Sequence, residues 1–334
     1  MATITVIIPV YNSEKYLKRC LDSLIQQDIR LPYKVYIVDD GSEDQSAQIA
    51  KEYCIKNPDL FTYFYKKNGG QGSARNYGLE YCSSEYVVFV DSDDYVEKSF
   101  LSTLYELCEV NNAEISMCGV NRVMSEDGFG KRFDSGFSKD FVTEDIDSLL
   151  LTCSFAPWNK MFSRKVIGSL RFPEGMTYED FAIIPQIINR ATKVAYNHTI
   201  LYHYFFNPNS TIVSANRLKK TDRNIIFAQH ILEESELNRK PFILENFYLR
   251  RVLSSMAWSL LEYHEDENEV LALVEEALKK YPNIKNNTII KQEPIQKRIF
   301  LILILHKRIL IGKVWVNAFS CIRKIKNKFF MNKT

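Results

Sequence analysis

The sequence has no long apolar run, no excess of glycine or proline, and no glycine-rich fingerprint of a familiar nucleotide-binding loop. Its 334 residues include 12 Gly and 10 Pro, with 46% hydrophobic and 25% charged residues. This composition excludes collagen-like, low-complexity and intrinsically disordered proteins. No run of 18 apolar residues occurs, so we expect no membrane-spanning helix. The length predicts one large domain or two modest ones.

Cysteine and signal-peptide patterns are also missing. The seven cysteines form an odd, irregularly spaced set without a C-x-x-C pair, which argues against a disulfide framework and a zinc site. The N-terminus has neither the basic start nor the apolar run of a signal peptide. Together these features predict a cytoplasmic protein in a reducing compartment.

Charge is divided unevenly along the chain, although the net charge is only +2. Residues 291–334 carry eleven Lys or Arg and one acidic residue, whereas residues 1–290 carry 32 basic and 40 acidic side chains. An acidic body argues against nucleic acid as a partner, because neutralising phosphates requires a basic face. The basic segment is therefore expected to have a partner of its own.

The first hundred residues alternate between strand and helix patterns. Apolar, β-branched runs predict buried strands, and the stretches between them repeat apolar residues at helical spacing. The expected strands are 3–10, 33–38, 60–65 and 86–90. This order predicts an α/β fold with a mostly parallel central sheet flanked by helices. Ser42-Glu43-Asp44-Gln45 has the form of a capping box, which predicts that a helix begins there.

The pattern weakens after residue 111. We expect extended segments near 115–120, 158–163 and 194–206, helices near 145–153 and 179–189, and a polar loop at 125–137. Residues 218–280 have the periodicity of amphipathic helices and no strand signal.

Polar segments follow the expected strands, where open parallel sheets bind ligands. In residues 91–94 an apolar strand ends in three carboxylates, Asp91, Asp93 and Asp94. Carboxylates placed so closely repel one another. A divalent cation with oxygen ligands would offset that repulsion and could also hold a diphosphate. The alternative is a solvated turn that caps the next helix.

Three further segments are candidates with plain alternatives. Asp39 or Asp40 could accept a hydrogen bond from a base or ribose, or could simply precede a helix start. The glycines before Arg75 let the backbone approach an anion, or they form an ordinary loop with a surface arginine. Glu179-Asp180 would open a helix, where acidic residues also favour the helix dipole.

Together these segments resemble the family-2 inverting glycosyltransferases of the GT-A fold, of the bacterial surface-polysaccharide type. The matching segments are Ile7-Ile8-Pro9-Val10-Tyr11-Asn12, Val38-Asp39-Asp40-Gly41-Ser42, Gly72-Ser73-Ala74-Arg75-Asn76, Asp91-Ser92-Asp93 and Glu179-Asp180. Order and spacing both match, and the resemblance covers about residues 1–210.

The resemblance implies a role for each matching residue. The uracil end of a nucleotide-sugar pocket would be lined by Pro9, Tyr11, Asp39 and Asp40. The nucleotide would also lie near Gly72 and Arg75. Asp91-Ser92-Asp93 would be the D-x-D motif, with Asp91 and Ser92 at the donor and Asp93, with Asp91, at Mn²⁺ or Mg²⁺. Asp180 would be the general base.

Two minor candidates belong to the same resemblance. Trp158 could stack on an acceptor sugar or pack in the core, and Lys160 could meet a phosphate. His203 could be a metal ligand or a core residue.

The implied activity is metal-dependent, inverting transfer of a hexosyl or N-acetylhexosaminyl group from a nucleotide sugar, with UDP favoured. The acceptor would be a hydroxyl of a glycan or a polyprenyl-linked sugar in polysaccharide, capsule or glycolipid synthesis. Two alternatives are a non-catalytic nucleotide-sugar-binding subunit of a membrane assembly and a sugar nucleotidyltransferase.

We expect a GT-A catalytic domain at 1–215, with a nucleotide-sugar half at 1–110 and an acceptor half at 111–215. A helical extension at 216–290 and a basic amphipathic tail at 291–334 would follow. The tail suggests peripheral binding to the anionic inner face of the cell membrane. The alternative is docking on the protein's own acidic body or on the second chain of a homodimer.

Overall fold

The computed structural model describes residues 3–123, 130–132, 137–206, 221–264 and 266–331. The chain divides into two compact units, Met1–Val213 and Ser214–Thr334. The division of the second part at residue 290 stays a prediction. Each unit is described by itself.

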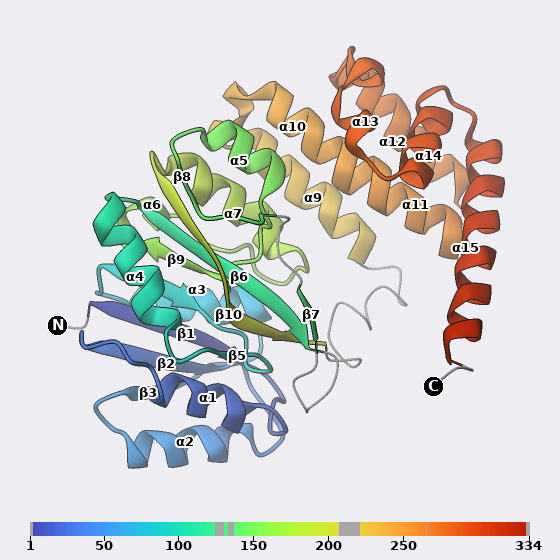
Figure 1. Ribbon diagram of the computed structural model, residues 1–334. Coiled ribbons are helices and arrows are strands. Elements are labelled where there is room, and N and C mark those ends of the chain that lie inside the picture. The colour runs from blue at the N-terminus through green and yellow to red at the C-terminus, as the bar shows by residue number, and fades with distance from the viewer. Residues whose placement is uncertain (1–2, 124–129, 133–136, 207–220, 265, 332–334) are drawn as a thin grey trace. The chain divides into compact units, whose positions relative to one another are not determined.

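Unit 1 is built on a mixed ten-stranded sheet (Figure 1). The strand order is β3-β2-β1-β4-β9-β6-β10-β5, with β7 paired to β6 and β8 paired to β10. The strands are β1 Ile4–Val10, β2 Tyr33–Asp39, β3 Phe61–Tyr65, β4 Tyr86–Phe89, β5 Tyr95–Val96, β6 Ile115–Val123, β7 Gly130–Arg132, β8 Phe141–Thr143, β9 Lys160–Ser163 and β10 Val194–Phe205.

The first four strands, β1 to β4, pair in parallel, as their apolar, β-branched sequences predict. β9 then runs antiparallel to both β4 and β6 and joins the two halves of the sheet. β6 and β10 are parallel to one another. The sheet is therefore mixed as a whole and parallel where the nucleotide-sugar half was expected.

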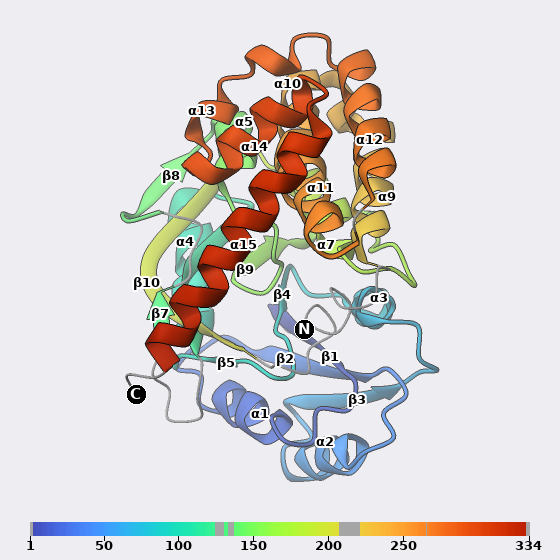
Figure 2. The same cartoon turned by 90° about the vertical axis from the view of Figure 1, so that its right-hand side faces the viewer.

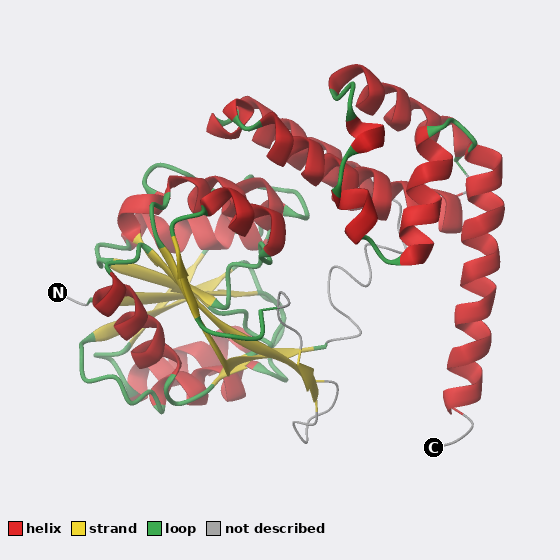
Figure 3. Cartoon of the chain, turned by 45° about the horizontal axis from the view of Figure 1, so that its top comes forward, coloured by secondary structure: helices red, strands yellow, loops and turns green. Residues whose placement is uncertain are grey.

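Helices cover both faces of this sheet (Figure 3). They are α1 Leu17–Ile25, α2 Ser46–Lys56, α3 Gln71–Tyr81, α4 Phe100–Asn111, α5 Ile146–Thr152, α6 Arg164–Ile167 and α7 Glu179–Arg190. In α1, helical spacing places Leu17, Leu21 and Leu24 on one buried face. That face packs in the core against β1 residues such as Ile4 and Val6.

The predicted capping box at residues 42–45 is wrong. α2 begins only at Ser46, and its N-cap Gln45 makes no side-chain capping bond. Ser42 Oγ instead accepts a bond from the backbone N–H of Asn12, and Asp44 accepts from the N–H groups of Glu14 and Ser46. Ser42 thus joins two loops, and Asp44 bonds both to the loop after β1 and to the first N–H of α2. The expected loop at 125–137 contains the short strand β7, and its other residues except 137 lie outside the described residues.

Unit 2 is helical, as the pattern from residue 218 onward predicts (Figure 2). Its elements are α9 Thr221–Glu234, α10 Pro241–Phe247, α11 Ala257–Ser259, α12 Glu267–Lys280, α13 Ile289–Gln292, α14 Ile295–Leu305 and α15 Ile309–Met331. Two π-helical stretches, Tyr248–Met256 and Leu260–His264, flank α11. Among the described residues, no helix combines the length and apolarity that crossing a bilayer requires.

Candidate active site

The loops after the parallel strands meet at one edge of the sheet, because the carboxyl ends of parallel strands lie together. The backbone N–H of Asn12, after β1, donates to Ser42 Oγ, after β2, over 3.1 Å. The hydroxyls of Ser13 and Ser92 lie 2.7 Å apart and join the β1 loop to the β4 loop. The structure therefore brings together the segments that the sequence analysis selected.

Asp40 shapes the glycine loop from within. Its carboxylate is buried at the end of β2 and accepts bonds from Lys66 Nζ at 2.6 Å and from the N–H groups of Gly69 and Gly70 at 3.0 and 2.7 Å. Gly70 has a φ of +88°, a conformation that glycine adopts without steric cost. Asp40 thus fixes the backbone through which this loop would approach a ligand.

Asp39 is equally buried beside it. One carboxylate oxygen accepts from the Ser42 N–H at 2.8 Å and the other from the Tyr63 hydroxyl at 2.7 Å. Pro9 is buried on β1, whereas half of the Tyr11 side chain is exposed. These predicted uracil-site residues lie on the adjacent strands β1 and β2 or in the loops that follow them, and their contact with a nucleotide stays a prediction.

The three carboxylates after β4 have different surroundings. Asp94 is fully buried, and its oxygens accept from the Tyr202 hydroxyl at 2.6 Å and from the Phe205 N–H at 2.7 Å. Burial and the neighbouring Asp93 and Asp91 raise the pKa of Asp94 well above its ordinary value. Asp94 therefore anchors the loop to β10.

Asp91 and Asp93 remain partly exposed. Asp91 Oδ1 accepts from Arg75 Nη2 at 2.9 Å and from Gln71 Nε2 at 2.8 Å. The Asp93 carbonyl accepts from Arg19 Nη2 at 2.8 Å. The loop is thus held by α3 on one side and by α1 on the other.

The carboxylates of Asp91 and Asp93 suit a hard cation whose remaining coordination positions are filled by a bound ligand. Within the described residues, no three His, Cys, Asp or Glu side chains form a complete metal cage. Mg²⁺ and similar ions are commonly held by one or two carboxylates together with substrate phosphates. Asp93 and Asp91 fit such a half-site, which a diphosphate would complete.

Arg75 is buried rather than displayed to a ligand. Its side chain is 2% exposed and pairs with Asp91 and with Glu179 Oε1, the latter over 2.8 Å. Burial raises the pKa of Glu179 to about 7, although Arg75 acts in the opposite direction. Arg75 therefore links the β4 loop to the first turn of α7.

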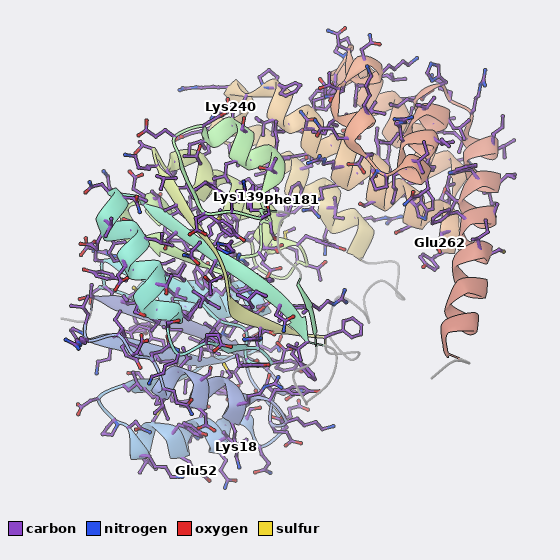
Figure 4. The ribbon with its side chains drawn as sticks, in the orientation of Figure 1. Lys18, Glu52, Lys139, Phe181, Lys240 and Glu262 are labelled. Atoms are coloured by element: carbon purple, nitrogen blue, oxygen red, sulfur yellow. The ribbon has the colours of Figure 1, made fainter. Side chains whose placement is uncertain are left out.

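Asp180 is the second residue of α7 and is partly exposed. Figure 4 labels the next residue, Phe181, whose N–H donates to Asp180 Oδ1 at 2.7 Å. The role of Asp180 as the general base stays a prediction.

Residues 5–171 match the family model for glycosyl transferase family 2. The chain belongs to this family. It is 33% identical over 214 residues to glycosyltransferase GlyA of Streptococcus pneumoniae, covering 60% of this chain and 30% of GlyA. It is 29% identical over 295 residues to the minor teichoic acid biosynthesis protein GgaB of Bacillus subtilis, covering 82% of this chain and 32% of GgaB. The chain thus spans about a third of the length of these two relatives.

A third relative is TarS of Staphylococcus aureus, a poly(ribitol-phosphate) β-N-acetylglucosaminyltransferase. It is 38% identical over 125 residues, covering 36% of this chain and 22% of TarS. The solved structure of TarS 1–349 with UDP-GlcNAc superimposes with a TM-score of 0.75 at 21% identity, covering 96% of this chain and 92% of that one. This match confirms the GT-A fold expected from the sequence.

Trp158 and His203 both stack on aromatic rings of this family-2 chain. Trp158 is 9% exposed and stacks on Tyr202 and Tyr204, with ring centroids 4.6 and 5.6 Å away. His203 stacks on Tyr95, and its Nε2 lies 2.6 Å from Glu97 Oε1. Trp158 thus takes the packing role.

The sequence analysis assigned no role to three residues that build the site: Arg19, Lys66 and Tyr202. Lys66 follows β3 directly, so its place at the functional edge was a usable signal. Arg19 and Tyr202 act on the β4 loop from 74 and 111 residues away. No local pattern marks a contact at such a separation.

Proposed function

We propose that this glycosyltransferase moves a sugar from a UDP-sugar to an acceptor hydroxyl with inversion at the anomeric carbon. The proposal rests on the contact of three parts of the chain: the loop after β4, Arg75 of α3 and the first turn of α7. The Asp91 and Asp93 loop stands at the carboxyl edge of the sheet, and Arg75 links it to the helix turn that holds Asp180. We infer from this link that the donor-side and acceptor-side carboxylates belong to one site.

Donor binding is assigned to the loops after β1 to β4. Tyr11 offers a half-exposed ring to a base, and the buried carboxylates of Asp39 and Asp40 lie at the end of the neighbouring strand β2. Ser92 lies along the same edge, in the β4 loop. A divalent ion held by Asp93 and Asp91 would supply positive charge for the departing diphosphate.

The transfer needs one base and no covalent intermediate. Asp180 takes the proton as the acceptor O–H bond breaks, and the acceptor oxygen forms a bond to the anomeric carbon. The bond between that carbon and the diphosphate oxygen breaks in the same step, and UDP leaves with the electron pair. A single displacement of this kind inverts the configuration.

The relatives support a role in cell-surface polymer synthesis. GgaB is named for minor teichoic acid biosynthesis, and TarS for transfer of N-acetylglucosamine. We infer an N-acetylhexosaminyl or hexosyl donor and a glycan, polyol-phosphate or polyprenyl-linked acceptor.

The first test is calorimetric titration of the full chain with UDP-sugars, with Mn²⁺ and with chelator. We expect binding of at least one UDP-sugar that weakens at least tenfold in chelator. Asp93→Ala should lose this metal dependence, because it removes an oxygen ligand. If the folded protein binds no nucleotide sugar, the proposed donor site is wrong.

The second test concerns the base. Asp180→Asn keeps the size of the side chain but cannot accept the proton, so we expect UDP affinity within twofold of wild type. UDP release from the bound donor should fall at least a hundredfold, in line with the usual contribution of a general base of about 10²–10⁴. Normal turnover by this variant would remove Asp180 from the mechanism.

We further propose that the segment 291–334 binds an anionic membrane surface. On α15, exposed apolar residues recur along one face: Leu310, Ile311, Val314 and Ile322 are between 52% and 71% exposed. Ile309 and Val316 on the other face are buried. A helix that is apolar on an outward face and rich in cations is suited to the interfacial zone of a bilayer.

Trp315 takes no part in this exposed stripe. It is half-buried and donates a bond to the Gln296 carbonyl at 3.0 Å. Two of the cations pair within unit 2, Lys307 with Glu275 and Lys313 with Glu267, at 2.7 and 2.6 Å. Docking on the protein's own acidic residues therefore explains the positions of Lys307 and Lys313. The exposed apolar stripe supports the proposal that α15 binds a membrane.

A further inference from the structure

We propose that residues 72–76 of α3 form a positioning clamp that fixes the first turn of α7, and with it Asp180, relative to the Asp91 loop. The inference deepens the proposed function and rests on it for the role of Asp180. The sequence analysis placed the same segment at the nucleotide. The clamp instead acts on the acceptor side of the site.

Asn76 holds the chain that leads into α7. Its Nδ2 donates to the Phe172 carbonyl at 2.8 Å, and the Phe172 N–H donates to its Oδ1 at 2.8 Å. Both bonds are buried. A two-point bond to one backbone residue fixes its orientation as well as its distance. The segment 172–178 therefore starts from a set position.

Gly72 allows this segment to lie directly against α3. A Cβ at Gly72 would stand 2.9 Å from the Pro173 carbonyl oxygen, 3.1 Å from Phe172 Cβ and 3.2 Å from Glu179 Cγ. The first of these neighbours is backbone, which cannot move aside as a flexible side chain would. Close contact between α3 and the loop that leads into α7 therefore requires glycine at position 72.

Arg75 completes the clamp between the two sides of the site. Its Nη2 pairs with Asp91 at 2.9 Å and its Nη1 with Glu179 at 2.8 Å, and its guanidinium lies 5.3 Å from the centre of the Phe172 ring. A planar guanidinium can hold two carboxylates in fixed directions, whereas a lysine ammonium is a point charge. The partners are 16 and 104 residues away in sequence.

The decisive comparison is Gly72→Ala with Glu80→Ala as matched control. Both changes add helix propensity to α3, but Glu80 is exposed, so only the methyl at 72 meets the α7 loop. We expect Gly72→Ala to lower the rate of UDP release from UDP-N-acetylglucosamine at least tenfold, with UDP affinity within twofold of wild type. Arg75→Lys should also lower turnover, and Glu80→Ala should change neither turnover nor UDP affinity.

Two results would overturn the clamp. Unchanged turnover in Gly72→Ala would mean that α7 does not need this contact. A parallel fall of UDP affinity and turnover would place the segment at the nucleotide. As a control, the unfolding temperature of each variant is measured, and only variants that unfold above the assay temperature are compared.

A second measurement does not depend on UDP binding. Hydrogen exchange of the full chain should be faster across residues 172–182 in Asn76→Ala, because the Phe172 amide loses its acceptor. Exchange in the 91–96 loop should stay unchanged. Equal exchange of wild type and variant across 172–182 would refute the clamp. If the wild-type protein binds no nucleotide, the proposed function fails while this measurement still decides the clamp.

Discussion

At Lys160 an ammonium group is held on a side chain with no exposed surface, at the start of β9. Its Nζ donates to the Ala156 carbonyl and to Asn159 Oδ1, both at 2.8 Å. Because both partners are neutral, burial dominates and lowers the pKa of Lys160 to about 8. The sequence analysis considered this lysine for a phosphate contact. Its burial follows from the place of β9 between β4 and β6, which no local pattern reveals.

This residue predicts a pH dependence of stability. Between pH 8 and 10.5 the unfolded chain binds a proton at Lys160 that the folded protein has lost. The free energy of unfolding should therefore rise with pH in this window, by at most about 1.4 kcal/mol per pH unit. Urea unfolding at several pH values between 8 and 10.5 measures this free energy. Lys160→Met is the comparison, because all other groups titrate alike in the two proteins. Parallel curves for the two proteins would contradict the lowered pKa.

At the scale of elements, β10 holds the loop after β4 in place. The Tyr202 hydroxyl accepts from the Asp91 N–H at 3.2 Å and donates to Asp94, and the Phe205 N–H donates to the same carboxylate. A strand more than 100 residues downstream thus determines the shape of the D-x-D loop.

Tyr202→Phe tests this contact. The change leaves a buried Asp94 oxygen without its donor, so we expect the free energy of unfolding to fall by about 1–3 kcal/mol. Tyr36→Phe is the control, since its hydroxyl makes one exposed bond of 3.3 Å to the Tyr81 carbonyl. Its effect should stay within about 0.5 kcal/mol. Denaturant unfolding compares the two, and equal effects would contradict the anchoring role.

The difference between local patterns and long-range contacts explains what the sequence could and could not predict. The strands β1 to β4 follow from local apolar runs, and the polar loops after them follow from where those runs end. The start of α2 was mispredicted because Ser42 and Asp44 bond to residues about 30 positions away. The burial of Arg75 depends on Glu179, 104 residues distant. Local patterns thus located the edge of the site, and long-range contacts decide what each side chain does there.

At the scale of the whole molecule, the basic segment is part of a folded unit. Phe300, Leu301, Ile304 and Leu305 of α14 are buried, and α14 and α15 pack on one another in unit 2. Removing residues 291–334 would therefore expose the core of this unit. Substitutions on the exposed stripe are the cleaner test of membrane binding.

Leu310→Glu combined with Val314→Glu should weaken binding to vesicles containing phosphatidylglycerol at least tenfold. The change places charge on the face that would enter the bilayer interface. Ile55→Glu on α2 is the matched control, because Ile55 is 79% exposed and lies in unit 1. Co-sedimentation measures vesicle binding, and analytical ultracentrifugation measures self-association. Unchanged vesicle binding with lost self-association would assign the stripe to a second copy of the chain.

The bonds from Asn76 to Phe172 have a consequence for protein engineering. They involve only main-chain atoms of Phe172, so a loop of different sequence can be held at the same point. Residues 174 to 178 lie between this fixed point and Glu179, and Glu174 and Gly175 among them are exposed. Loops from relatives could therefore be grafted here while Asn76 keeps its two bonds to the main chain of Phe172; only its 3.3 Å bond to Glu174 Oε1 depends on the loop sequence.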